Sequence, residues 1–183
     1  MKNLFIISAM FCLFGGAMNQ AKACSPSKPT LASMIESYNA GAFLLVQGYF
    51  EPPKEGIFSS NFVVTRSSDP SIKVGESYNV YEYGPFGSMC EMYEMESSVD
   101  RDKTGKNKPR LLFVYKDRSK KGKLVTPIFW DEGLSIKGEK IEYEDKDYDE
   151  KQKYVTYQYS ASLSNLWKQV LAGGKLKFER KKR

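Results

Sequence analysis

Histidine is absent from this sequence of 183 residues. Serine–histidine and cysteine–histidine nucleophile pairs, and metal sites with imidazole ligands, are therefore excluded. A lysine base or a carboxylate pair remains chemically open, but no lysine or carboxylate lies in a recognisable catalytic motif. We therefore expect a protein that is not an enzyme, with no catalytic residue, no bound metal and no cofactor.

Long apolar runs are also lacking. The run Leu4–Phe14 has about ten residues, whereas a helix that crosses the hydrocarbon core needs about 20. With Lys2 before it and the small-x-small triplet Ala21–Ala23 after it, this run has the pattern of a secretory signal. We assign residues 1–23 to a signal peptide and expect no transmembrane segment. The mature chain, which then begins at Cys24, is expected to be secreted or periplasmic.

A cysteine that directly follows a signal can instead be acylated, as in bacterial lipoproteins. That processing favours a large aliphatic residue three places before the cysteine and small residues at the next two places. Ala21 and Lys22 depart from this pattern. We therefore prefer ordinary cleavage after Ala23. A lipid-anchored or periplasmic structural envelope protein remains the alternative.

Cysteine is scarce, with three residues in the whole chain. Removal of the signal takes away Cys12 and leaves Cys24 and Cys90. Because exported proteins meet oxidising conditions, these two cysteines most simply form one disulfide, Cys24–Cys90. In the loop-closure model such a disulfide adds roughly 4 kcal/mol to the free energy of unfolding. Two unpaired thiols are the alternative.

The positive charge of the chain is concentrated at its end. Loss of the signal removes two of the 28 basic residues and none of the 22 acidic ones, which leaves a net charge of +4. Residues 175–183 alone carry +5, so residues 24–174 are close to neutral. A nucleic-acid-binding domain is expected to carry a basic stripe across its fold. We therefore expect no nucleic-acid partner, and we expect residues 175–183 to form a frayed basic tail, which could also bind an acidic surface.

Short apolar or alternating segments separated by turn signals dominate the mature chain. They predict strands at 42–50, 57–66, 78–83, 89–93, 110–115, 124–130 and 154–159, and a hairpin over 134–143 that turns near Lys137-Gly138. Gly48, inside the first of these strands, indicates a bulge or a sharp bend. Many short strands with close turns predict a mainly antiparallel barrel or sandwich in one domain, residues 24–174.

Two short helices are also predicted, one after each of the N-cap residues Thr30 and Ser162. Apolar residues recur at helical spacing behind both caps; they are Leu31, Met34, Ile35 and Tyr38 in the first helix, and Leu163, Leu166, Trp167, Val170 and Leu171 in the second. Gly41 ends the first helix and Gly173-Gly174 the second.

Three other groups of residues were weighed as sites. The segments Asp145–Asp149 and Asp100–Gly105 resemble the opening of a calcium loop, but neither completes the ligand set, so we interpret both as solvated loops in the charged stretches 144–153 and 100–109. Four tyrosines at strand spacing could form an aromatic binding surface; they are Tyr78, Tyr81, Tyr83 and Tyr93. Core and cross-strand packing is the interpretation that we prefer for them.

With the mature N-terminus at Cys24, the chain shows a characteristic order of elements. The N-terminal cysteine is followed by Ser25-Pro26, a short helix and the strand 42–50, and a later strand ends in a glycine-rich turn from Gly84 to Cys90. This order resembles the netrin-like domain of the tissue inhibitors of metalloproteinases, as a distant bacterial-type member. The resemblance covers roughly Cys24 to Trp130. It implies an OB-like five-stranded antiparallel barrel with an N-terminal and a C-terminal helix.

The resemblance also implies a function. In that family the N-terminal cysteine is disulfide-bonded to the barrel and inserts into the zinc site of a protease. The corresponding residues here are Cys24, Ser25 and Pro26, the candidate partner-binding residues, with Cys90 as the disulfide partner. The expected function is that of an exported, non-enzymatic binding protein with a metalloprotease-like protein partner. The alternative is that Cys24–Cys90 is a purely structural staple.

Overall fold

The computed structural model describes residues 27–52, 60–86, 91–97, 108–148, 151 and 153–183. The predicted signal peptide and the residues Cys24, Ser25, Pro26 and Cys90 lie outside these ranges. Within them the chain forms two helices and ten strands, in the order α1 (Leu31–Asn39), β1 (Phe43–Phe50), β2 (Asn61–Ser67), β3 (Ser77–Phe86), β4 (Glu91–Glu96), β5 (Arg110–Tyr115), β6 (Lys123–Pro127), β7 (Leu134–Lys137), β8 (Lys140–Tyr148), β9 (Tyr154–Ser162), α3 (Leu163–Leu171) and β10 (Glu179–Lys182).

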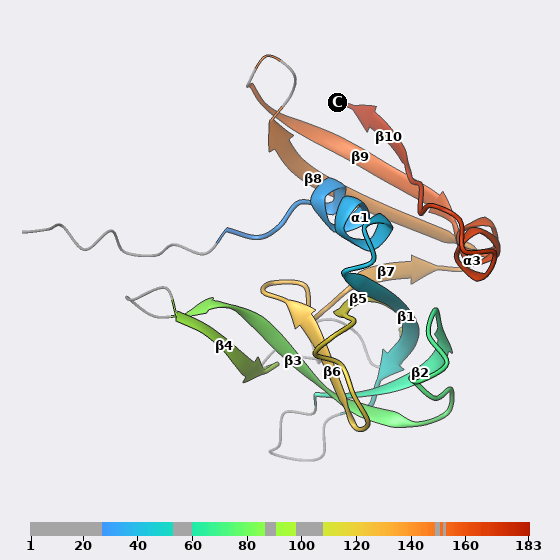
Figure 1. Cartoon of the computed structure of the whole chain (residues 1–183). Helices are drawn as coiled ribbons and strands as arrows, with labels where there is room; N and C mark the ends of the chain where they lie inside the picture. Colours follow the sequence, from blue (N-terminus) through green and yellow to red (C-terminus); the bar gives the residue numbers. More distant parts are fainter. Residues whose placement is uncertain (1–26, 53–59, 87–90, 98–107, 149–150, 152) are drawn as a thin grey trace, which may run out of the picture.

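The ten described strands form one sheet. Nine of them follow the order β10-β9-β8-β7-β5-β1-β2-β3-β4, and all neighbours in this order are antiparallel. The strand β6 lies off this path and pairs in parallel with β3. Figure 1 shows β1 to β6 in the lower half of the molecule, β8, β9 and β10 in the upper half, and α1 between them.

The mainly β class is confirmed, but the described strands do not form the predicted five-stranded barrel. The sheet has ten strands and is not closed. The strands β5, β1, β2, β3 and β6 are neighbours in that order, so they would close into a small barrel only if β6 also paired with β5. Instead β5 has β1 on one edge and β7 on the other, where Leu111 lies opposite Leu134. The hairpin β8–β9 and the strand β10 then extend the sheet beyond β7.

The central strands β1 and β5 separate two hydrophobic cores. Alternate side chains point to opposite faces of a strand, so a strand that is buried on both faces has a continuous apolar run. On one face lie Phe43, Leu45, Leu111 and Phe113, in a core that also includes α1, α3 and strands β7 to β9. On the other face lie Leu44, Val46, Leu112 and Val114, in a core shared with β2, β3 and β6. This explains why both strands are almost entirely apolar.

Gly48 lies at an irregularity of β1, as predicted. The register between β1 and β2 shifts between Gln47 and Gly48. A Cβ atom at Gly48 would lie 2.0 Å from the carbonyl oxygen of Val63. Glycine is therefore required at this position because the two backbones approach closely.

The two helices pack with the predicted residues. Thr30 caps α1, and its Oγ1 accepts a hydrogen bond from the Ser33 amide at 3.3 Å. The predicted apolar residues of α1 and α3 are buried or packed against the first core, except Leu171, which is exposed. Ser162 occupies the N-cap of α3, but its side chain makes no capping hydrogen bond. No helix in the described ranges is long and apolar enough to span a bilayer.

The frayed basic tail is wrong. Residues Glu179–Lys182 form β10, which pairs with β9. The Arg180 guanidinium lies 3.5 Å from the centroid of the Tyr157 ring and 3.4 Å from a carboxylate oxygen of Asp147, and Arg183 lies 2.6 Å from Glu144. The prediction of a solvated loop over 144–153 is also wrong as far as Tyr148, because residues 144–148 belong to β8. Two carboxylates of β8, those of Glu144 and Asp147, therefore pair with two arginines of the tail.

Candidate partner-binding site

The described chain begins at Ser27, directly after the predicted binding residues Cys24, Ser25 and Pro26. The site is therefore built from the residues that hold the segment Ser27–Thr30 against the domain. This segment is extended and leads into α1. Two side chains far away in the sequence, Trp130 and Asp145, hold it.

Trp130 anchors the segment from below. Its ring is buried, and its Nε1 donates a hydrogen bond of 2.8 Å to the carbonyl oxygen of Pro29. The ring also packs edge-on against Phe113 of the first core, with a centroid distance of 6.0 Å. The Lys28 ammonium lies 5.0 Å from the centroid of the Trp130 ring and 5.5 Å from that of Tyr143. Lys28 is thus held by cation–π attraction, and Pro29 by a hydrogen bond.

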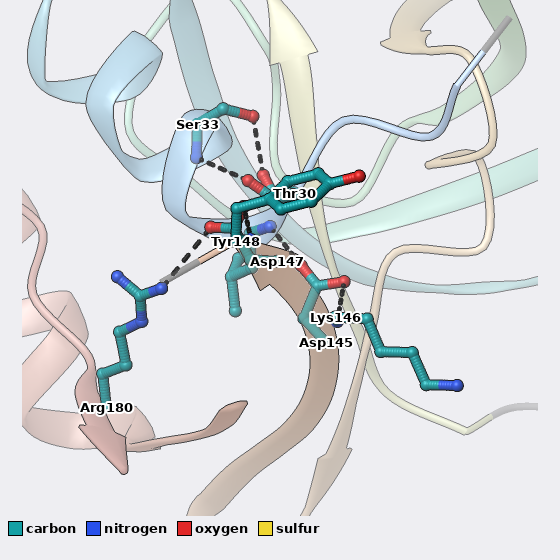
Figure 2. A network of polar contacts seen from close by, with 8 residues as sticks. Thr30, Ser33, Asp145, Lys146, Asp147, Tyr148 and Arg180 are labelled. Atoms are coloured by element: carbon teal, nitrogen blue, oxygen red, sulfur yellow. Dashed lines mark hydrogen bonds and ion pairs between the residues drawn. The ribbon is translucent and has the colours of Figure 1, made fainter. Parts of the chain in front are cut away.

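Asp145 fixes the start of α1. Its Oδ2 accepts a hydrogen bond of 2.6 Å from the amide of Leu31, the first residue of the helix. Figure 2 shows Asp145 beside Thr30 at this helix end, with Arg180 reaching Asp147 on the same strand. A carboxylate at a helix N-terminus satisfies a free amide and interacts favourably with the helix dipole. The carboxylate that was weighed as part of a calcium loop therefore stabilises a helix.

A cavity of about 540 Å³ lies beside the held segment. Its lining comes from the N-terminal segment, from β3, β5, β7 and β8, and from the loop between β6 and β7; the residues are Lys28, Glu82, Arg110, Phe129, Trp130, Asp131, Glu132, Gly133, Ser135, Glu142 and Tyr143. Burial lowers the pKa of Arg110, and the negative charge of Glu132 opposes that shift. Two cationic and four carboxylate side chains therefore line the cavity beside aromatic rings.

The loop between β6 and β7, residues 128–133, is held by hydrogen bonds to residues of β3 and to Ser97. The Phe129 amide donates to Oε1 of Glu82 at 2.5 Å, and the Ile128 amide donates to the carbonyl oxygen of Tyr83 at 3.1 Å. The buried carboxylate of Asp131 accepts a hydrogen bond from the Ser97 hydroxyl. The loop is therefore tied to β3 and to the residue that follows β4.

Phe129 has a strained backbone. Its φ is 63°, the only positive φ at a non-glycine residue in the described ranges, and its side chain is 45% exposed. Left-handed angles are unfavourable for a bulky residue and are retained where the surrounding structure imposes them, often at binding sites. This loop therefore holds an exposed aromatic ring beside the N-terminal segment at an energetic cost.

The predicted tyrosine surface is divided by the structure. Tyr78 is buried in the second core, as the preferred interpretation expected. Tyr81 and Tyr83 lie beneath the cations of Lys123 and Arg118, at 4.5 and 3.6 Å from the ring centroids. Tyr93 is 47% exposed on β4.

The arrangement suits binding by ion pairs, hydrogen bonds and aromatic contacts. No group of three or more cysteine, aspartate or glutamate side chains within the described part of the chain is placed to hold a metal ion. Sequence reasoning missed Glu82, Phe129 and Asp145, and placed Trp130 in a strand rather than in a loop. Comparison of the chain with protein-family models, with curated proteins and with solved structures found no match.

Proposed function

We propose that this chain is an exported, non-enzymatic binding protein, which binds a protein partner through its mature N-terminus in the manner of the metalloproteinase inhibitors that it resembles. The observation that carries this proposal is the fixation of residues 28–31. Lys28, Pro29 and Leu31 are held by Trp130, Tyr143 and Asp145. A binding segment whose base is held in place loses less conformational entropy when it meets its partner.

The strand order supports the implied OB-like core. The strands β5, β1, β2 and β3 lie in that spatial order, with a β1–β2–β3 meander and a later strand beside β1. This is the arrangement of a Greek key, and a partly open Greek-key barrel is the basis of the OB fold. In this proposal β6, parallel to β3, is the fifth strand of the core, and β4 and β7 to β10 are additions to it.

The binding chemistry follows from a free N-terminus at Cys24. An α-amino group has a pKa near 8, so about neutral pH a fraction of it is unprotonated and can bind a metal. Together with the Cys24 carbonyl oxygen it would chelate the zinc of a protease and displace its catalytic water. Lys28 follows Cys24 by four residues, Glu82 precedes Cys90 by eight, and both line the cavity. That a residue after Cys24 and a residue before Cys90 line one cavity supports the proposed Cys24–Cys90 disulfide.

The test combines mass with inhibition. The intact mass of the exported protein should equal that of residues 24–183 with one disulfide. This protein should inhibit at least one member of a panel of zinc proteases. A matched variant with one extra alanine before Cys24 should be equally stable and should lose inhibition, because its amino group is displaced from the zinc. Equal inhibition by the two proteins, or inhibition of no member of the panel, would contradict the proposal.

The position of Cys24 directly after the signal favours one alternative, a structural envelope protein that is either lipid-anchored through Cys24 or periplasmic with Cys24–Cys90 as a purely structural staple. A Cys24 whose amino group is acylated cannot chelate a metal, and a Cys24 whose sulfur carries a lipid cannot form the disulfide. A mass increase equal to that of a lipid anchor would therefore establish the lipid-anchored form and exclude the zinc chelation.

A further inference from the structure

The strand β4 forms one end of the sheet, and no described strand pairs with its outer edge. Figure 1 shows β4 beside β3 at the left end of the lower strands. The amide of Ser97 donates to the carbonyl oxygen of Val80, which sets the antiparallel hydrogen-bond pattern of this hairpin. In that pattern the backbone groups of Met92, Glu94 and Glu96 point away from β3. The outer edge therefore offers backbone donors and acceptors at these three positions.

Large apolar side chains are concentrated around this edge. Of the eight exposed large hydrophobic residues in the described ranges, four lie here: Met92 at 51%, Tyr93 at 47%, Met95 at 50% and Phe129 at 45% exposure. Tyr93 and Met95 lie opposite Gly84 and Glu82 of β3, and those two residues contact the loop that carries Phe129. Tyr93, Met95 and Phe129 thus share one face of the hairpin, which we name the β4 apolar face.

The opposite face of β4 is acidic. Glu94 lies opposite Tyr83, where it pairs with Lys123 and Arg118. Glu96 lies opposite Tyr81 and accepts a hydrogen bond of 2.6 Å from the neutral hydroxyl of Ser60, so its charge is not compensated by that contact. From Tyr93 to Glu96 the strand therefore alternates between apolar and acidic residues, with Met92 on the face of Glu94 and Glu96, and the strand contains no basic residue.

The other end of the sheet is protected. The strand β10 has the sequence ERKK, and all four residues are exposed and charged. Charged residues on an edge strand prevent pairing with another chain, whereas exposed apolar residues on an edge favour it. The contrast between the two ends indicates that the edge of β4 is available for a partner strand.

We propose that β4 binds an extended, basic segment of a partner protein, which adds a strand to the sheet. A basic side chain would lie opposite Glu96, another would lie near Glu94, which Lys123 and Arg118 already pair with, and the alternate, apolar side chains would contact the β4 apolar face. Opposite charges directly across a strand pair are stabilising and like charges are destabilising. A second copy of this chain fits poorly, because antiparallel pairing that uses all three outward positions places Met92 opposite Glu96, so that Glu96 of neither copy meets a basic side chain.

The strain at Phe129 supports this surface. Glu82 holds the Phe129 amide, so the ring stays exposed beside Met95 although its backbone angle is unfavourable. A preformed aromatic contact reduces the ordering cost of binding. This inference does not depend on the chemistry of Cys24.

The probes are two capped peptides, Lys-Val-Lys-Val-Lys-Val-Lys and its counterpart with glutamate in place of lysine. Hydrogen exchange of the mature protein is followed by NMR. At saturating Lys–Val peptide the exchange rates of the Met92, Glu94 and Glu96 amides should fall by about 10-fold or more. The exchange rates of the β10 amides should not change. The Glu–Val peptide should give no protection.

Matched variants locate the contact. Replacement of both Tyr93 and Met95 by serine should weaken binding of the Lys–Val peptide by about 5-fold or more, because truncation of central contacts typically costs over 1 kcal/mol. Leu171→Ser, at an exposed apolar residue of α3, should bind like the wild type. Glu96→Gln should weaken the binding of the Lys–Val peptide by a few fold. The variant with an extra alanine before Cys24 should also bind normally, which separates this inference from the proposed inhibition.

Three outcomes would overturn the inference. Equal binding of the two peptides would show that charge does not select the partner. If neither peptide binds, the outer edge of β4 does not accept an added strand. Protection of the β4 amides that rises with protein concentration, without peptide, would identify a second copy as the occupant.

Discussion

The strain at Phe129 leads to a prediction with an unusual sign. At most positions glycine is less stable than alanine by about 0.5–1 kcal/mol, because it gains more conformational freedom on unfolding. At φ 63° an alanine keeps a steric penalty of about 1–2 kcal/mol that glycine does not have. The difference of these two effects is about 1 kcal/mol. We therefore expect Phe129→Gly to be more stable than Phe129→Ala by about 1 kcal/mol.

Comparison of the two variants isolates the backbone effect. Both lose the ring, and both keep the amide that donates to Glu82. The assay is urea unfolding at a fixed pH, in which a difference of about 1 kcal/mol shifts the midpoint by roughly 0.5 M at unchanged slope. Tyr154, exposed in β9 with an ordinary backbone, is the control position, where the alanine variant should be the more stable one. If Phe129→Gly is no more stable than Phe129→Ala, the backbone strain is absent and the argument for an imposed exposed ring fails.

Three further predictions concern the anchor, the bulge and a surface ion pair. Trp130→Phe removes the donor to Pro29 and should cost about 1 kcal/mol and speed hydrogen exchange before α1, as NMR would show; unchanged exchange would contradict the anchor. Gly48→Ala places a methyl group 2.0 Å from a carbonyl oxygen of β2 and should cost roughly 3 kcal/mol in urea unfolding, whereas a loss below 1 kcal/mol would contradict that close approach. The hydrogen bond from Lys123 lowers the pKa of Glu94 below its ordinary 4.5. The stability that this pair contributes is therefore complete above pH 4.5 and is lost as the pH falls through the lowered pKa of the folded state. Lys123→Met should reduce the slope of stability against pH below 4.5, and an unchanged slope would contradict this assignment.

The strands that are buried on both faces were the most predictable part of the fold. Both β1 and β5 have continuous apolar runs, and the sequence placed each within one residue of its observed ends. The bulge at Gly48 was also predictable, since an isolated glycine in such a run needs a structural reason. These features depend on local pattern, which the sequence contains directly.

The ends of the sheet were less predictable. Most of β8 is a charged segment, and only its alternate residues, such as Ile141 and Tyr143, face the core. The strand β10 carries no apolar residue, and its place beside β9 depends on Arg180 meeting Tyr157 and Asp147. Composition alone predicts a solvated tail for such a segment, because the neutralising carboxylates lie on another strand.

The candidate site was out of reach for a related reason. Trp130 meets Pro29 across 101 residues of sequence, and Asp145 meets Leu31 across 114. No local pattern reports such contacts, and Asp145 instead resembled part of a metal loop.

These long-range contacts have a consequence for function. The segment that leads to the predicted binding residues is held by the β6–β7 loop and by β8, not by its neighbours in sequence. The resemblance to an inhibitor family ends near Trp130, yet Asp145 and Tyr143 lie beyond that point. A shortened chain that ends after β6 would therefore keep the predicted binding residues Cys24, Ser25 and Pro26 and lose the side chains that position the segment after them. In the proposed mechanism, the added strands β7 to β10 are thus part of the binding device, since they fix the base of the N-terminal segment before the partner arrives.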